Sequence, residues 1–298
     1  MGPSCRRCGP RVHVTAGLTA RPQGHRTVGA RQAVIMRAEF ARLRPWLAVA
    51  GAVLAVGVLV PPAGTEARRY VFAQAVQFAV LAVVVPPLVV LGAPWRFGGA
   101  GSRLARMRSR AAATVSTPVG SVWSPIATAG SGWSFPRGSA AALVGFIAIA
   151  LAWRLPHAVN ALVRYPALTV VEAVTLIGAG CALWLELAES PPLKPRISRP
   201  LRAAFAALPM WSIWASAYIM GFSRATWFTA LARRGGLSTV ADQQIAAALL
   251  FAIAGLTFVP VVYVCLITWL RDTARAGDEC RAATGPVAPR PPRGWRRL

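Results

Sequence analysis

The chain has 298 residues, 55% of them hydrophobic, and its 33 basic residues against nine acidic ones give a net charge of +24. A soluble protein with this charge would be expected to bind nucleic acid through basic residues spread over a polar surface. Here the basic residues avoid the apolar runs and no recognisable nucleic-acid motif is present, which argues against nucleic acid as a partner. The pattern is typical of a membrane protein with basic loops.

The N-terminal segment, residues 1–38, has no hydrophobic periodicity, and we predict a disordered basic extension. Met36, near its end, is a plausible translation start just before the first apolar run. Cys5 and Cys8 form a C-x-x-C pair, a pattern that can hold a metal or act in redox chemistry. In a segment without a hydrophobic pattern we do not expect such a site.

Six apolar runs are long enough, at about 17 to 25 residues, to cross the hydrocarbon core of a bilayer. The first is longer than the core of a typical signal peptide and has a poor cleavage context after it, so we expect it to be retained. We predict an all-α fold, a polytopic membrane helical bundle of about six transmembrane helices in one domain at 39–272. A flexible cytoplasmic loop at 96–138 lies within it, and a disordered Pro/Arg-rich tail follows at 273–298. The runs are 45–62, 72–94, 139–156, 166–188, 203–222 and 244–270.

The distribution of Lys and Arg predicts the orientation. With six crossings, 26 basic residues fall on the side of the termini and seven on the other side. Because cytoplasmic loops carry the basic excess, we expect both termini to lie in the cytoplasm. We expect a multi-pass protein of the bacterial cytoplasmic membrane, whose basic loops meet anionic lipid.

The second run, "YVFAQAVQFAVLAVVVPPLVVLGAPW", contains two glutamines and a Pro-Pro pair in an otherwise apolar stretch. Gln74 and Gln77 share one face of a helix because they are three residues apart. They lie in the outer half of the second helix. Pro86 and Pro87 are predicted to kink or end this helix in its inner half.

The later runs carry further polar residues toward the same outer side. The third ends in "LAWRLPHAVN", the fourth carries a glutamate about two turns from its outer end, and the sixth begins in "LSTVADQQIAAALL". Intramembrane polar groups face a bundle interior or a wet cavity, because exposure to lipid is costly. The candidates for lining an outward-facing cavity are Gln74, Gln77, Trp153, Arg154, His157, Glu172, Asp242, Gln243 and Gln244.

The alternative is that these groups only join helices through interhelical hydrogen bonds, each worth about 1 kcal/mol or less. For Gln74 and Gln77 alone the two interpretations are evenly balanced. For the whole set we favour a functional cavity. Glu172 in particular needs a cation if it is ionised, and Arg154 is the nearest candidate by depth.

Four stretches together resemble the CtaG-type cytochrome c oxidase assembly factors, polytopic bacterial membrane proteins. "VPPLVVLGAPW" is similar to the family's ending of its second helix, and "AWRLPHAVNAL" to its Trp-His-x-Pro segment. "VVEAVTLIGAGCALW" resembles its Glu-His helix, and "LSTVADQQIAAALLF" its Asp-Gln-Gln helix start. The resemblance implies a role in building haem-copper oxidases, with oxidase subunits as partners. The retained positions are Gln77, Trp153, Pro156, Glu172, Asp242, Gln243 and Gln244.

The resemblance also implies histidines at positions where this chain has Gln74, Phe78, Arg154 and Ala173. A protein copper site prefers imidazole, thiolate or thioether ligands. The outer side offers one imidazole, His157, and one thioether, Met220. The sequence therefore argues against a high-affinity copper site. If copper binds at all, His157 is the candidate ligand.

Three functions follow from these patterns. The first is a non-enzymatic assembly factor that helps to mature or metallate a haem-copper oxidase from the outer side. The second is a small-solute or proton carrier that uses Glu172, Arg154 and Asp242 as relay groups; the chain has no internal repeat to support it. The third is an enzyme, for which no nucleophile–base pair, metal-ligand set or phosphate loop is present. We favour the first.

Overall fold

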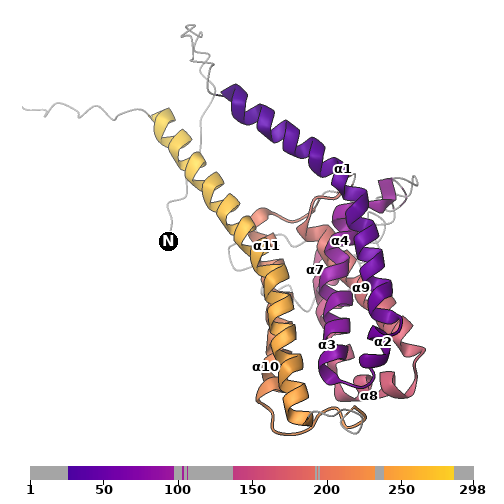
Figure 1. Cartoon of the computed structure of the whole chain (residues 1–298). Coiled ribbons are helices and arrows are strands. Elements are labelled where there is room, and N and C mark those ends of the chain that lie inside the picture. Colours follow the sequence, from indigo (N-terminus) through magenta and orange to yellow (C-terminus); the bar gives the residue numbers. More distant parts are fainter. Residues whose placement is uncertain are drawn as a thin grey trace, which may run out of the picture. The chain divides into compact units, whose positions relative to one another are not determined.

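A computed structural model of the chain describes residues 26–96, 103, 106, 137–191, 193, 195–231 and 238–284, with side-chain environments between residues 43 and 279. Its regular structure is helical throughout these ranges, which confirms the all-α prediction. The elements are α1 (Arg26–Leu59), α2 (Ala63–Glu66), α3 (Val71–Ala79), η1 (Val80–Val84), α4 (Val85–Gly92), η2 (Pro94–Arg96), α7 (Arg137–Arg154), α8 (Pro156–Arg164), α9 (Leu168–Leu187), α10 (Arg199–Phe222) and α11 (Thr239–Thr284) (Figure 1).

The helices in the described ranges include five that are long and apolar enough to cross a membrane. A sixth apolar segment, Leu43–Leu59 within α1, is shorter. The predicted helical bundle with several apolar helices of membrane-spanning length is thus confirmed, while the actual crossings, including one by the first run, stay a prediction. The five are Val71–Arg96, Arg137–Arg154, Leu168–Leu187, Arg199–Phe222 and Thr239–Glu279.

Helices extend into parts of both ends for which the sequence predicted disorder. α1 begins at Arg26, and α11 continues to Thr284. Both extensions are rich in Ala and Arg, which are strong helix formers, and this propensity extends the helices where hydrophobic periodicity is absent. Cys5, Cys8 and most of the predicted loop at 96–138 lie outside the described residues. Residues 43–298 form a compact unit separate from residues 1–42, and the candidate site lies within this larger unit.

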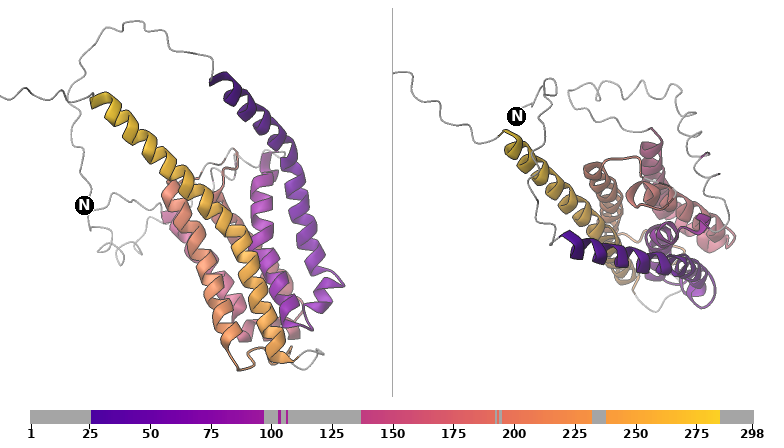
Figure 2. Two further views of the ribbon diagram at one scale, coloured as in Figure 1. Left: turned by 60° about the vertical axis from the view of Figure 1, so that its left-hand side comes forward. Right: turned by 90° about the horizontal axis from the view of Figure 1, so that it is seen from above.

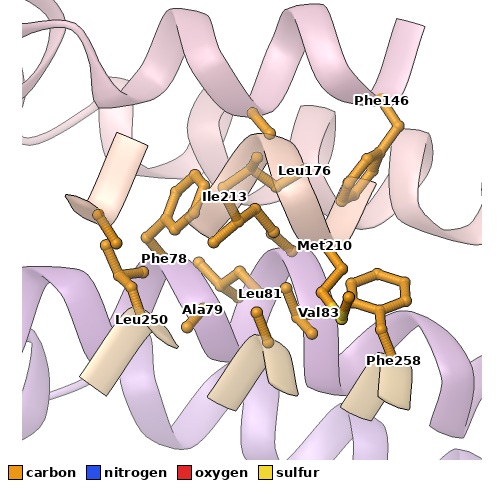
Figure 3. Close-up of a cluster of buried hydrophobic side chains, with 14 of the residues drawn as sticks. Phe78, Ala79, Leu81, Val83, Phe146, Leu176, Met210, Ile213, Leu250 and Phe258 are labelled. Carbon is orange, nitrogen blue, oxygen red and sulfur yellow. The ribbon is translucent and has the colours of Figure 1, made fainter. Parts of the chain in front are cut away.

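The core of the unit surrounds α3 and its continuation through η1 into α4. This segment packs against α9 on one side, and α3 and η1 also contact α11, while α10 runs along α11 (Figure 2). Apolar side chains from α3, η1, α7, α9, α10 and α11 pack together there (Figure 3). They include Phe78, Leu81, Phe146, Leu176, Met210, Ile213, Leu250 and Phe258.

The Pro-Pro pair neither ends the second span nor stops its helical path. Pro86 and Pro87 occupy the first turn of α4, where a missing backbone N–H is tolerated. One turn of π-helix, Val80–Val84, precedes them and carries the chain from α3 into α4. A π-turn is a known way to absorb a break in the helical hydrogen-bond ladder. The helix ends only at Gly92, where Ala93 adopts a left-handed conformation with φ of 47°.

Pro86 packs against a glycine of α9. A Cβ atom placed on Gly180 would lie 2.8 Å from Pro86 Cβ and 3.0 Å from the carbonyl oxygen of Ala82. We expect Gly180→Ala to lower the free energy of unfolding by about 1–3 kcal/mol through overpacking. Gly178→Ala is the matched control, because a Cβ atom added to Gly178 on the same helix would meet no heavy atom within 4 Å. Thermal unfolding of the purified protein compares them, and equal midpoints would contradict this packing.

The third span ends one residue before a new helix. Arg154 closes α7, Leu155 is extended with ψ of 139°, and Pro156 opens α8. α8 buries Val159 and Leu162. Together with α2, the start of α3 and the start of α11, it forms one end of the bundle, which we call the α8 end (Figure 1). The charge distribution predicts that this end faces outward.

Candidate functional site

The two glutamines of α3 both point into the bundle. Gln74 is 4% exposed and Gln77 6%, as expected for residues one helical turn apart on one face. The face they share is directed toward α9, because Glu172 of that helix lies in contact with Gln74. The first two turns of α3 therefore deliver two amide groups to the interior near the α8 end.

Gln74 connects two buried charged groups. Arg154 Nη1 donates a hydrogen bond of 2.6 Å to Gln74 Oε1, and Gln74 Nε2 donates one of 3.4 Å to Glu172 Oε1. Arg154 is 8% exposed and Glu172 1%. No direct ion pair joins Arg154 and Glu172 in the described part of the chain. The amide, which both donates and accepts, bridges the cation and the carboxyl group.

The rest of the Arg154 environment is also suited to a cation. Arg154 Nη2 lies 3.3 Å from Met220 Sδ on α10. The guanidinium carbon lies 5.3 Å from the centre of the Phe78 ring and 5.6 Å from that of Phe228. Aromatic faces attract cations at such distances. Three segments (α3, α10 and the stretch after α10) thus supply oxygen, sulfur or ring faces to one positive charge.

A small pocket adjoins this cluster at the α8 end. Its volume is about 20 Å³, and both Gln77 and Glu172 line it. Gln77 Nε2 is buried without a hydrogen-bond partner among the described residues. The complete lining is Leu59, Gly64, Ala67, Arg68, Gln74, Gln77, Leu162, Val163, Thr169 and Glu172.

Asp242 holds the start of α3 from another helix. Its carboxylate accepts hydrogen bonds from the backbone N–H groups of Val71 (2.8 Å) and Phe72 (2.9 Å). Tyr70, the residue before α3, supplies no side-chain cap. An anion at a helix N-terminus satisfies free N–H groups and opposes the helix dipole. Asp242 thereby fixes the turn of α3 that carries Gln74.

We expect Asp242→Ala to lower the free energy of unfolding by about 1–3 kcal/mol, because the buried N–H of Val71 and the partly buried N–H of Phe72 lose their acceptor. The nearby but exposed Gln244 provides the control, Gln244→Ala, which should change stability by less than about 0.5 kcal/mol. Unfolding of both purified variants in detergent measures this difference. Equal stability would mean that the cap contributes nothing.

Gln243 organises the segment between α10 and α11. Its Nε2 donates to the carbonyl oxygen of Met220 at 2.7 Å, and its Oε1 accepts from the N–H of Trp227 at 3.3 Å. Phe228, one of the two rings near Arg154, directly follows Trp227. Gln243 therefore acts on the Arg154 environment through this segment.

The remaining predicted residues lie away from the buried cluster. Trp153 is partly buried and donates from Nε1 to Thr175 Oγ1 at 2.9 Å, which joins α7 to α9. His157 and Gln244 are exposed. The structure thus gathers Gln74, Arg154 and Glu172, with Gln77 beside them, and leaves His157 and Gln244 outside.

A family model described as cytochrome c oxidase caa3 assembly factor matches residues 25–272, most of the chain. The chain belongs to the cytochrome c oxidase caa3 assembly factor family. The resemblance inferred from four motifs is thereby confirmed. No curated protein and no solved structure matches the chain.

The donor groups of this family member's buried cluster do not fit copper. Soft metal ions prefer imidazole, thiolate or thioether ligands. The Met220 sulfur already faces Arg154, and His157 is exposed. No group of three or more His, Cys, Asp or Glu that could hold a metal occurs within the residues the structure describes. A fixed guanidinium at the centre also repels an incoming cation.

Three of the positions at which the family resemblance implies histidine come together in space. They are occupied by Gln74, Phe78 and Arg154, and Arg154 contacts both of the others. In this chain, the place of these histidines is taken by the Arg154 guanidinium and the groups that accept its hydrogen bonds, Gln74 Oε1 and Met220 Sδ.

Sequence reasoning missed the parts of the site that come from loops and from the pocket rim. Phe228 lies in a segment without regular structure, and its position beside Arg154 has no periodic signal. Thr169 and Arg68 line the pocket, but single Thr and Arg residues near helix ends are common. Met220, by contrast, was named from the sequence as the thioether on the outer side, at a depth similar to that of His157.

Proposed function

We propose that this family member assists the maturation of a haem-copper oxidase through the buried cluster of Arg154, Gln74 and Glu172, and that it catalyses no reaction itself. The observation that supports the proposal is the link from Arg154 through Gln74 to Glu172, which joins α7, α3 and α9 away from water. Buried ionisable groups in membrane-spanning helices are costly, so retaining them favours a functional role.

The placement in the cell is part of the same proposal. The protein is a multi-pass protein of the bacterial cytoplasmic membrane with both termini in the cytoplasm. The α8 end then faces the outer side, where exposed Arg69, Arg164 and Arg224 are available to oxidase subunits. Charged groups at such a rim set the specificity and rate of association more than its strength.

The proposed contribution to the oxidase does not require copper to be held at Arg154. The cluster is filled by a guanidinium, so its influence on maturation runs through the arrangement of the helices and through protein contacts. Delivery of copper needs imidazole, thiolate or thioether ligands, and in this protein such ligands would have to lie outside the cluster.

The test is the oxidase of a strain that lacks the gene. Cytochrome c oxidase activity and the copper content of the purified oxidase are measured with and without a plasmid copy. We expect an inactive oxidase in the deletion strain and recovery with the plasmid. A normal oxidase would contradict the assembly role and favour the alternative, a carrier of a small solute or proton.

A further inference from the structure

Gln77, beside the buried cluster, and Glu172, within it, have unfilled hydrogen-bonding capacity among the described residues. Gln77 Nε2 is a buried donor with no partner in the described part of the chain. From the described residues, the Glu172 carboxyl group accepts one long hydrogen bond, 3.4 Å from Gln74 Nε2, although a carboxylate offers about four acceptor positions. Buried polar groups without partners are rare because desolvation without compensation is costly. Each such group calls for a partner that the described residues do not supply.

Both groups line the same pocket. Its volume is about 20 Å³, which exceeds the roughly 10–15 Å³ needed to hold one water molecule. The hydroxyl-bearing Thr169 and the rim residue Arg68 are also in its wall. A bound water needs two to four polar neighbours, and this wall offers them. The pocket therefore has both the size and the polarity for a single water.

A second hollow also touches Gln77 and has a different character. Its volume is about 180 Å³, and its lining is apolar apart from Gln77 and Glu66. Glu66 already lies 3.6 Å from Arg69 in an ion pair. The small pocket that Glu172 lines is therefore the better place for a hydrogen-bond partner of the Gln77 amide.

We propose that the small pocket binds one water molecule that accepts a hydrogen bond from Gln77 and donates one to Glu172. This water extends the chain from Arg154 through Gln74 and Glu172 to the rim at the α8 end, where Arg68 and Ala67 of the α2–α3 connection line the pocket. It accounts for the burial of Gln77, whose amide nitrogen has no partner within the described residues. The inference stands on the pocket alone and does not depend on the role in oxidase maturation.

The sign of one stability change distinguishes a bound water from an empty pocket. Gln77→Leu removes the amide but keeps a side chain of similar size. If the amide were unpaired, its removal would leave the melting temperature unchanged or raise it. If the amide binds water that also serves Glu172, the melting temperature falls. The melting temperature of the full chain is measured in lipid nanodiscs. Substitution of the exposed Gln244, Gln244→Leu, is the control and should leave the melting temperature unchanged.

A double-mutant cycle locates the second partner of the water. Gln77→Leu and Glu172→Gln are made singly and together, and a water shared by both groups predicts that the two shifts do not add. Additive shifts, or a Gln77→Leu variant at least as stable as the wild type, overturn the proposal. An experimental map that resolves ordered water gives a second measurement without any variant. Density between Gln77 and Glu172 is expected, and an empty pocket in such a map also overturns it.

Discussion

Arg154→Met is expected to lower the free energy of unfolding by about 3–5 kcal/mol, because it leaves Glu172 buried without the cation that compensates it. The guanidinium also loses its contacts with Gln74 Oε1 and Met220 Sδ. Chemical or thermal unfolding of the purified full chain measures the change. The control is Arg164→Met at the exposed end of α8, which should stay within about 0.5 kcal/mol of the wild type.

A second substitution shows whether the loss comes from charge. Replacing a buried pair of charges by neutral groups of similar size is often close to neutral. The double variant Arg154→Met/Glu172→Gln should therefore regain most of the stability lost in Arg154→Met. A double variant as unstable as the sum of the two single variants would mean that the guanidinium acts through packing rather than through Glu172.

Glu172→Gln is expected to reduce oxidase activity in cells to the level of the strain lacking the gene. The substitution keeps the size of the side chain but removes the negative charge facing the Gln74–Arg154 link. Oxidase activity is measured after complementation of the deletion strain, at matched amounts of each variant in the membrane.

Cys181→Ala is the matched control on the same helix. Cys181 is only partly buried, lies more than two turns away from Glu172 and is a free thiol. Its replacement should leave oxidase activity unchanged. Equal activity of the Glu172→Gln and Cys181→Ala strains would remove the cluster from the function of this assembly factor.

The helices were predictable because long apolar runs carry a strong signal for spans. The path of the second span was not. The sequence predicted a kink or an end at Pro86, and the helical path does not end there, since a π-turn at Val80–Val84 leads directly into α4. That outcome depends on tertiary packing, since Gly180 of α9 leaves the space that Pro86 fills.

The meeting of Arg154 with the Glu172 region was predictable from depth, because both lie near the same ends of their helices. The bridging role of Gln74 was not, since depth says nothing of which side chain lies between two others. His157 was expected in the cavity, but the extended Leu155 and the new helix at Pro156 change its direction, and it is exposed. A helix running on through these residues would have put it one turn from Arg154 on the same face.

Asp242 illustrates a further limit of sequence reasoning. An acidic residue in the first turn of a helix is expected to stabilise its own N-terminus. Asp242 instead binds the N–H groups of Val71 and Phe72, some 170 residues earlier in the chain. Only the packing of α11 against α3 brings the carboxylate to that place.

The most direct test of the central claim uses the double variant Arg154→Met/Glu172→Gln in the deletion strain. The variant lacks both the positive charge of Arg154 and the negative charge of Glu172. It is expected to fold, because neither charge is left buried without its counterpart. With the variant present in the membrane at the wild-type amount, we expect cytochrome c oxidase activity as low as in the deletion strain. Wild-type oxidase activity would contradict the proposed role of the cluster in oxidase maturation and would mean that its charges serve only the stability of the fold.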